Sequence, residues 1–168
     1  MNPNIELIDA ACEGDVESAK NAISAGADDY NGALIWAAGC GRLEVFNYLI
    51  SNGSIDYNRV MEIAVRAGNE DIAYRLLYGG AAINHTDKSG KTHLQNAVKR
   101  RHTKVIKLLL EWGRVKPDQA DIDKAIEIAL SIDDTKTAFF LQKWQKDKVE
   151  MVKKLNDSGS CFSVWRNK

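Results

Sequence analysis

Residues 87–113 read DKSGKTHLQNAVKRRHTKVIKLLLEWG, and the spacing inside this stretch recurs along the chain. Within it, the apolar residue Leu94 stands three positions before Ala97. Repeats with a period of about 20 to 50 residues indicate supersecondary units stacked on one another. The same apolar-to-alanine spacing defines five units, at Leu7/Ala10, Leu34/Ala37, Met61/Ala64, Leu94/Ala97 and Ile126/Ala129.

Each unit is predicted to be a pair of short helices. Four positions after the alanine comes a turn residue, which is Gly14, Gly41, Gly68, Arg101 or Asp133. A second apolar run follows the turn and, in four units, ends at a glycine suited to a left-handed helix C-cap. These closing glycines are Gly26, Gly53, Gly80 and Gly113.

The alanine at one fixed place on every first helix has a packing reason. A small side chain lets neighbouring helices approach closely, whereas a larger one would push the stack apart. We therefore expect the substitution Ala64→Leu to destabilise the fold.

The tripeptide DYN occurs at residues 29–31 and again, 27 positions later, at residues 56–58. An Asn or Asp just before a helix can accept a hydrogen bond from an otherwise unpaired N–H group. We predict that the helix N-caps are Asn4, Asn31, Asn58 and Asp123, with Tyr30 and Tyr57 closing the turns against the adjacent unit.

The fourth unit resembles the ankyrin repeat, which reads Asp, two variable residues, Gly, then Thr-Pro-Leu-His, an Ala, and a Val- and Leu-rich second helix. The resemblance implies an all-α helical-pair solenoid of about five repeats, in phase over residues 4–145. We expect one domain over residues 1–156, including a C-terminal capping helix, and a flexible tail at 157–168. The matching residues are Asp87, Gly90, Thr92, Leu94, Ala97, Val105, Leu108, Leu109 and Gly113.

The fourth unit departs from the family pattern at three residues. His93 replaces the proline, and Gln95 replaces the histidine, so the usual Thr to His contact is either made by Gln95 or absent. Arg101 replaces the turn glycine, which implies a left-handed non-glycine residue or an altered turn.

Unit length also departs from the family. Gly80 to Gly113 spans the family's 33 positions, whereas Gly14, Gly41 and Gly68 are only 27 apart. The six missing residues fall where ankyrin repeats project a β-hairpin finger. We therefore predict that tight turns join the first three units, that only residues 81–91 and partly 114–122 leave room for a finger, and that strand content is very small.

Three details of packing are predicted from the repeat phase. Trp36 is assigned to the core rather than to a ligand platform. Asn96, at the same place in its unit, would be a buried amide that either hydrogen-bonds across units or marks loose packing. Val149, Val152 and Leu155 are spaced to cover the last apolar face of the stack.

The sequence carries no sign of catalysis, a cofactor or a metal site. No glycine-rich nucleotide loop is present. The thiols Cys12, Cys40 and Cys161 are odd in number and lack paired ligand spacing, which favours free thiols over a disulfide or zinc site. His85, His93 and His102 are interpreted as structural or exposed rather than catalytic. We expect no enzyme activity.

The ends and the hydropathy of the chain predict a cytoplasmic location. No segment has the apolar length of a membrane span, and the acidic N-terminus lacks the features of a signal peptide. We expect the mature chain to begin near Met1 and to fold in a reducing compartment.

Charge is unevenly distributed although the net charge is zero. Residues 1–87 hold 5 Lys and Arg against 13 Asp and Glu, and residues 88–168 hold 18 against 10. One interpretation is a solvated basic face. The other, implied by the ankyrin resemblance, is a concave groove that binds an acidic peptide or protein surface. The residues assigned to that groove are Arg66, Lys88, Lys91, Lys99 and Arg100.

The predicted function is protein–protein recognition through the concave face, by a monomer or a weakly self-associating chain. Two alternatives stay open. The basic fourth repeat could bind anionic lipid or nucleic acid, although its aromatic residues are not interleaved with the cluster. The chain could also be a host-directed effector from an intracellular bacterium or virus, because ankyrin repeats occur in such proteins.

Overall fold

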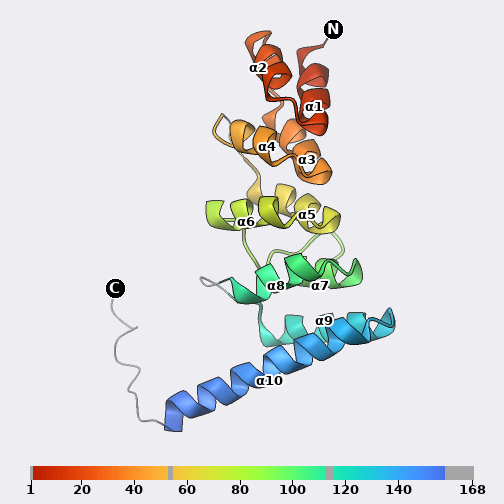
Figure 1. The fold of residues 1–168 in the computed structure, drawn as a ribbon, viewed down its shortest axis with the longest axis vertical. Helices are drawn as coiled ribbons and strands as arrows, with labels where there is room; N and C mark the ends of the chain where they lie inside the picture. Colours follow the sequence, from red (N-terminus) through yellow and green to blue (C-terminus); the bar gives the residue numbers. More distant parts are fainter. Residues whose placement is uncertain (1, 53–54, 113–115, 158–168) are drawn as a thin grey trace.

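The protein is a stack of helical pairs that runs from the N-terminus to the C-terminus (Figure 1). The computed structural model describes residues 2–52, 55–112 and 116–157, with side chains described as far as Lys154. Helix bounds are α1 Pro3–Glu13, α2 Val16–Ser24, α3 Tyr30–Cys40, α4 Leu43–Leu49, α5 Tyr57–Ala67, α6 Glu70–Gly79, α7 His93–Lys99, α8 Thr103–Glu111, α9 Gln119–Ser131 and α10 Thr135–Asp157.

Two columns of helices build the stack. The first helices α1, α3, α5, α7 and α9 each pack on the next in the order of the chain, and the second helices α2, α4, α6 and α8 do the same. This confirms the predicted helical-pair solenoid. None of the helices in the described residues is both long and apolar enough to cross a lipid bilayer.

The alanines of the repeat lie in equivalent positions in the core. Ala37, Ala64, Ala97 and Ala129 are fully buried, and Ala10 is 3% exposed. Larger apolar side chains such as Leu34, Phe46, Met61, Leu76 and Leu109 fill the space around them and are also fully buried. The equivalent burial confirms that these alanines mark the close approach of the first helices.

The predicted helix N-caps are wrong by a few residues. Asn4, Asn31, Asn58 and Asp123 all lie inside their helices. The side chains that accept hydrogen bonds from the first turn belong instead to residues two or more positions earlier. These N-caps are Asn2 for α1, Asp29 for α3, Asp56 for α5 and Asp118 for α9.

Three of the misassigned residues join neighbouring units, and we call Asn4, Asn31 and Asn58 the linker asparagines. The short linker that enters the next unit has backbone N–H groups without a helical partner, and such groups need an acceptor. A linker asparagine on the preceding first helix supplies its Oδ1 atom. Asn4 Oδ1 accepts from the N–H groups of Asp28 (2.8 Å) and Asp29 (3.0 Å), Asn31 Oδ1 from that of Asp56 (3.2 Å), and Asn58 Oδ1 from that of Ala82 (2.8 Å).

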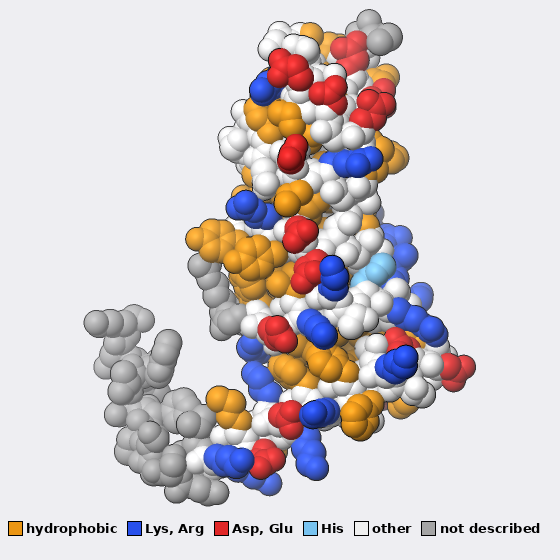
Figure 2. Space-filling view, viewed as in Figure 1, with side chains coloured by type: hydrophobic (Ala, Val, Ile, Leu, Met, Phe, Trp, Pro, Cys, Tyr) orange, Lys and Arg blue, Asp and Glu red, His pale blue; other side chains and the backbone are white. Residues whose placement is uncertain are grey.

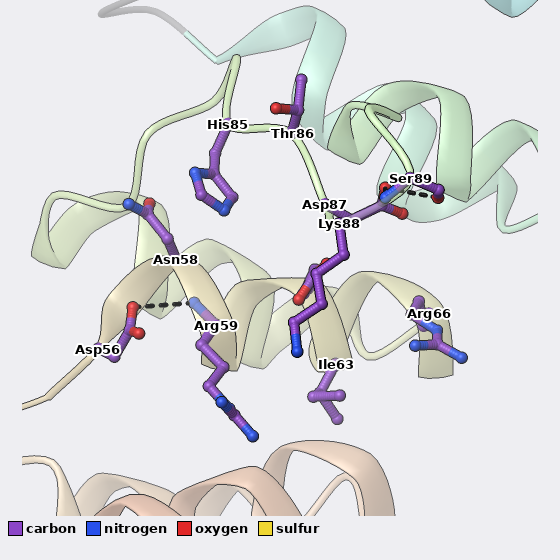
Figure 3. A pocket seen from close by; sticks show the side chains of 11 residues that line it. Asp56, Asn58, Arg59, Ile63, Arg66, His85, Thr86, Asp87, Lys88 and Ser89 are labelled. Carbon is purple, nitrogen blue, oxygen red and sulfur yellow. Dashed lines mark hydrogen bonds between the residues drawn. The ribbon is translucent and has the colours of Figure 1, made fainter.

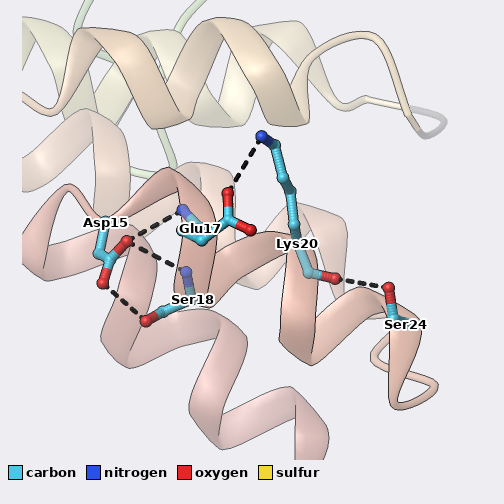
Figure 4. A network of polar contacts seen from close by, with 5 residues as sticks. All are labelled: Asp15, Glu17, Ser18, Lys20 and Ser24. Carbon is cyan, nitrogen blue, oxygen red and sulfur yellow. Dashed lines mark hydrogen bonds and ion pairs between the residues drawn. The ribbon is translucent and has the colours of Figure 1, made fainter.

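Among the second helices of the first four units, α2 begins with a side-chain N-cap (Figure 4), whereas α4, α6 and α8 have no side-chain cap hydrogen bond. One carboxylate oxygen of Asp15 accepts from the backbone N–H groups of Glu17 (2.9 Å) and Ser18 (3.1 Å). The other accepts from the Ser18 hydroxyl at 2.6 Å. These hydrogen bonds, of which the Ser18 side-chain bond is the largest contribution, lower the pKa of Asp15.

A second set of hydrogen bonds joins the units at the turn. The residue after the turn position reaches back to a carbonyl at the end of the preceding first helix. Arg42 donates from Nε to the carbonyl of Cys12 (2.8 Å), Asn69 donates to that of Ala38, and a ring nitrogen of His102 lies 3.1 Å from that of Arg66.

The turn residues adopt the left-handed backbone conformation. At Gly68, φ is +79°, and a Cβ atom would lie 2.6 Å from the His102 ring. Glycine is therefore required there both for its backbone conformation and for the space that the next unit fills. Arg101, which lacks this freedom, has φ of 60°, so the predicted left-handed non-glycine residue is confirmed.

One finger is present where the unit is long enough. Residues 81–91 project between α6 and α7 without forming a strand, and Thr86 and Thr92 make an isolated antiparallel bridge. No strand occurs in the described residues, in agreement with the prediction of very small strand content. Part of the second predicted finger, residues 114–122, lies outside the described residues.

The last helix caps the stack with its first half. Ala138 and Leu141 are buried, and α10 packs on α9. Val149 and Val152 are 50% and 55% exposed, so their assignment to the cap is wrong, and α10 extends past the stack (Figure 1). The side chain of Leu155 and residues 158–168 of the predicted tail lie outside what the structure describes.

Candidate interaction groove

An open groove of about 930 Å³ lies between the finger and α5 (Figure 3). Helix α5 forms one wall, and the finger overhangs it. We call this space the finger groove. Its lining residues are the N-cap Asp56, then Asn58, Arg59, Glu62, Ile63 and Arg66 from α5, and His85, Thr86, Asp87, Lys88 and Ser89 from the finger.

Cations of the finger groove are available for a ligand. Lys88 extends from the finger across α5, and Arg59 and Arg66 lie on that helix seven positions apart, on one face (Figure 3). None of these three side chains takes part in an ion pair with any described residue. Their charge is therefore not neutralised by a direct contact.

Two of the groove's carboxylates hold the structure together. Asp56 caps α5 by accepting from the backbone N–H of Arg59 at 3.1 Å. Asp87 closes the finger, because its Oδ1 atom accepts from the N–H groups of Ser89 (2.8 Å) and Lys91 (3.0 Å) and its Oδ2 atom accepts from Asn96 Nδ2 (2.8 Å).

The hydrogen bonds to Asp87 keep it ionised. Partial desolvation is the largest single influence and acts to raise its pKa, but the bonds from Ser89, Asn96 and Lys91 together outweigh it. The pKa of Asp87 is therefore held well below its usual range. The Asn96 amide thus donates within its own unit, to Asp87 and to the Thr92 carbonyl, and not across units, which was one of the two predicted alternatives.

The five residues that were assigned to one groove on the basis of the sequence do not all lie together in the structure. Arg66 and Lys88 line the finger groove. Lys91 is half-buried at the base of the finger, where its backbone pairs with Asp87. Lys99 and Arg100 are exposed at the end of α7 and are not lining residues.

Sequence reasoning missed Arg59 and His85 and misassigned Trp36. Trp36 is 51% exposed on α3, so its assignment to the core is wrong. The equivalent Asn96 is only 8% exposed, because the finger of its own unit lies over it. Unit two lacks those finger residues. Its shorter length in the sequence was therefore the observation that could have predicted an exposed Trp36.

Below the finger, a buried polar cluster joins units four and five. The Thr92 hydroxyl (2.6 Å) and the Gln95 side-chain amide (2.8 Å) both donate to one carboxylate oxygen of Asp121 on α9. Instead of the family's direct Thr-to-His contact, the Thr92 and Gln95 side chains share Asp121 as their acceptor. Asp121 is 5% exposed, and burial raises its pKa against the effect of those two hydrogen bonds.

His93 is buried beside this cluster. Its ring centroid lies 5.8 Å from that of His85. Desolvation, and then the charge of His85, lower the pKa of His93 to about 4, partly offset by Asp87. In the described residues, His93 Nε2 has no hydrogen-bond partner. The neutral form of His93 is therefore the one that the fold accommodates.

The surface shows the charge division predicted from the sequence. Figure 2 shows acidic side chains over the first units and Lys and Arg side chains gathered from α7 onward. The described residues contain no group of three or more His, Cys, Asp or Glu side chains placed to hold a metal ion. Charge recognition in an open groove is the chemistry that this arrangement supports.

A family model described as ankyrin repeats in three copies matches residues 61–160. That range is more than half of the 168 residues and begins at Met61, in the first helix of the third unit. Units one and two lie outside the match, although the structure continues the same stack through them. No curated protein matches the chain.

Proposed function

Because the chain belongs to the ankyrin-repeat family, whose members generally mediate protein–protein interaction, we propose that it binds an acidic protein partner through the finger groove. The observation that carries the proposal is the set of three groove cations, Arg59, Arg66 and Lys88, none of which is ion-paired within the described residues.

Charge in the groove is mixed, so recognition depends on which groups can still form bonds. Both oxygens of Asp87 and one oxygen of Asp56 already accept hydrogen bonds from the backbone or from a neighbouring side chain. Arg59 and Arg66 have guanidinium donors that suit a carboxylate fork, and Lys88 supplies a mobile ammonium. A partner segment with two or more Asp or Glu side chains fits these donors.

Apolar residues of this chain next to the groove cations extend the proposed binding surface. Ile63 lines the groove, and its Cγ2 atom lies 3.5 Å from where a Cβ on Gly39 would be. Trp36 is one turn before Gly39 on α3 and is half exposed. Aromatic side chains are frequent anchors of protein interfaces. The proposed binding surface therefore continues from the finger groove onto Trp36.

The function is proposed to be that of a non-catalytic adaptor in the cytoplasm. The stack would display the groove rigidly, and the field of the basic half would raise the rate of encounter with an acidic partner. A host-directed effector would use the same surface.

The test is affinity capture with the double variant Arg66→Glu/Lys88→Glu, followed by measurement of the affinity for each captured protein. A matched control, Arg75→Glu/Lys107→Glu, makes the same charge change at two exposed residues of second helices. We expect the groove variant to weaken binding at least about tenfold and the control to change it little. Equal losses in both variants, or none in the groove variant, would overturn the proposal.

The basic residues outside the groove favour one competing function. Lys99, Arg100 and Lys107 are exposed in unit four. If they bind an anionic polymer or membrane, the variant Lys99→Glu/Arg100→Glu will abolish binding to polynucleotide or to anionic vesicles at low salt. Absence of both kinds of binding in the wild type would remove this alternative.

A further inference from the structure

Two thiols from neighbouring units lie in contact. Cys12 is in the last turn of α1 and Cys40 is the last residue of α3, and these two helices pack side by side. The Sγ atoms of Cys12 and Cys40 are 2.8 Å apart. Cys12 is half-buried and Cys40 is exposed, so a small oxidant can reach the pair.

The surroundings of the pair hold it in place without competing for it. Arg42, which follows the turn of unit two, donates from Nε to the carbonyl of Cys12 at 2.8 Å. The hydrogen bond from Cys12, and then burial, raise the pKa of the Cys40 thiol. The Cys40 thiol is therefore protonated near neutral pH. No third side chain of the described residues joins them in a metal-binding group.

We propose that Cys12 and Cys40 form a reversible disulfide that crosslinks the first two units when a low-molecular-weight disulfide such as glutathione disulfide is present. This site is independent of the finger groove. Cys12 and Cys40 are free thiols in the structure, as the sequence predicts, and the proposal adds that they meet across one inter-unit boundary.

The chemistry is two successive thiol–disulfide exchanges. Cys40, the more exposed thiol, loses its proton to solvent, and its thiolate attacks glutathione disulfide to give a mixed disulfide and one glutathione thiol. Cys12 then loses its proton to solvent, and its thiolate attacks the Cys40 sulfur, breaking the mixed disulfide and releasing the second glutathione as a thiolate that takes up a proton from solvent. The protein loses two protons and two electrons in all, and glutathione disulfide takes up both to become two thiols.

The crosslink would act on the unit that is least supported. In the described residues, unit one packs on unit two alone. A solenoid unit with a single neighbour opens more readily than one held on both sides. Closing the chain between Cys12 and Cys40 holds α1 against α3 and encloses α2 in the loop. The expected consequence is slower local opening of unit one.

The experiment uses the full chain with Cys161→Ser, which removes the third thiol. The protein is equilibrated in glutathione buffers of increasing oxidised fraction, alkylated, and analysed by intact mass and peptide mapping. We expect a Cys12–Cys40 linkage whose equilibrium constant is at least roughly tenfold higher in the folded protein than in guanidinium chloride, because folding keeps the sulfurs in contact. Equal constants in the two states would overturn the proposal.

Single variants and hydrogen exchange complete the test. In the same background, Cys12→Ser and Cys40→Ser should each give only a mixed disulfide with glutathione. Oxidation should slow amide exchange in α1 and α2 and leave α9 unchanged. Accumulation of glutathione on both cysteines, without the linkage, would contradict the proposal, as would unchanged exchange in α1 and α2 after full oxidation.

Discussion

Units one to three and unit four differ by the six residues of the finger, and that difference changes both the surface and the junctions between units. In unit two, which lacks a finger, Trp36 on α3 is half exposed. In unit four, the finger covers the equivalent Asn96 and overhangs α5 to form the finger groove. The presence of the finger in unit four therefore determines where the groove forms on the stack.

The junctions differ in the same way. Linker asparagines join the short units through partly exposed backbone groups. The junction of units four and five instead uses the buried cluster of Thr92, Gln95 and Asp121. A hydrogen bond that water cannot replace costs more to lose than one that it can. Substitutions at the two kinds of junction should accordingly have unequal effects.

The packing of the alanines is the property that both regions share, and Ala64→Leu should disrupt it. Ala64 is fully buried on α5, which packs against α3 and α7. The extra methylene groups cannot be accommodated without separating the helices, so we expect a loss of about 3 kcal/mol or more in the free energy of unfolding. Chemical denaturation measures it.

The control for this prediction is Ala67→Leu, which makes the same change at an exposed position of the same helix. It should alter stability by less than about 0.5 kcal/mol. Similar stabilities for the two variants would show that α5 is not closely packed. The counterpart in the long unit, Ala97→Leu, should cost about as much as Ala64→Leu, since Ala97 is equally buried.

Asp121→Ala tests the buried junction. The substitution leaves the Thr92 hydroxyl and the Gln95 amide without their acceptor in a site closed to water. We expect a loss of about 2 to 3 kcal/mol in the free energy of unfolding. Asp121→Asn keeps an acceptor oxygen and should cost less than the alanine variant, and the reverse order would contradict the assigned role of the carboxylate.

Stability should fall in mild acid because of His93. Its pKa is about 4 in the folded protein and about 6.5 ordinarily, so between these values the unfolded chain binds a proton that the folded chain does not. The contribution of neutral His93 is fully present above about pH 6.5 and is lost as the pH falls toward 4. At pH 5 the loss is about 2 kcal/mol.

The measurement is the pH dependence of unfolding in the wild type and in His93→Gln. The variant should lack this loss, so the two curves should converge or cross on acidification. The raised pKa of Asp121 acts in the opposite direction, because its contribution is lost as the pH rises through the folded value, and it is common to both proteins. Parallel curves for the two proteins would contradict the assignment to His93.

Features that depend on the helix period could be predicted from the sequence, whereas features that depend on contacts between units could not. Burial of the first-helix alanines is set by the helix period and the repeat, and both can be counted in the sequence. The caps could not be assigned, because DYN offers an Asp and an Asn that are equally good N-caps. The choice depends on where the next linker lies, since only Asn58 can reach the N–H of Ala82.

The candidate groove was predicted in part. Arg66 and Lys88 could be assigned because the repeat phase gives the face on which each lies. Arg59 was available by the same logic, seven positions before Arg66 on one helix face. The meeting of Cys12 and Cys40 was also accessible, because they are 28 residues apart in units that repeat every 27. That the two thiols touch could be established only from the structure.

The turn glycine Gly68 and the closing glycine Gly80 allow the two demands on a glycine, for a left-handed backbone and for space, to be tested separately. Gly68 and Gly80 both have positive φ, of +79° and +108°. A Cβ on Gly68 would meet the His102 ring, whereas a Cβ on Gly80 would meet nothing within 4 Å. We expect Gly68→Ala to cost about 1 kcal/mol more than Gly80→Ala. Equal costs in thermal unfolding would mean that the His102 ring moves aside freely.

The smallest effect is expected at a linker asparagine. Asn58→Ala removes the acceptor of the Ala82 N–H, at the boundary between the short units and the finger. Because this backbone group lies near the surface, water can replace the lost oxygen, and the loss should be under about 1 kcal/mol. The local consequence should be clearer than the global one, since the finger begins at residue 81.

Hydrogen exchange distinguishes these two consequences in Asn58→Ala. The Ala82 amide and its neighbours in the finger should exchange faster, while amides of α1 and α9 keep their rates. A loss of stability as large as that of Asp121→Ala would remove the contrast between surface and buried junctions. It would also mean that the finger depends on α5 for its position, so that the finger groove and the third unit would fold as one element.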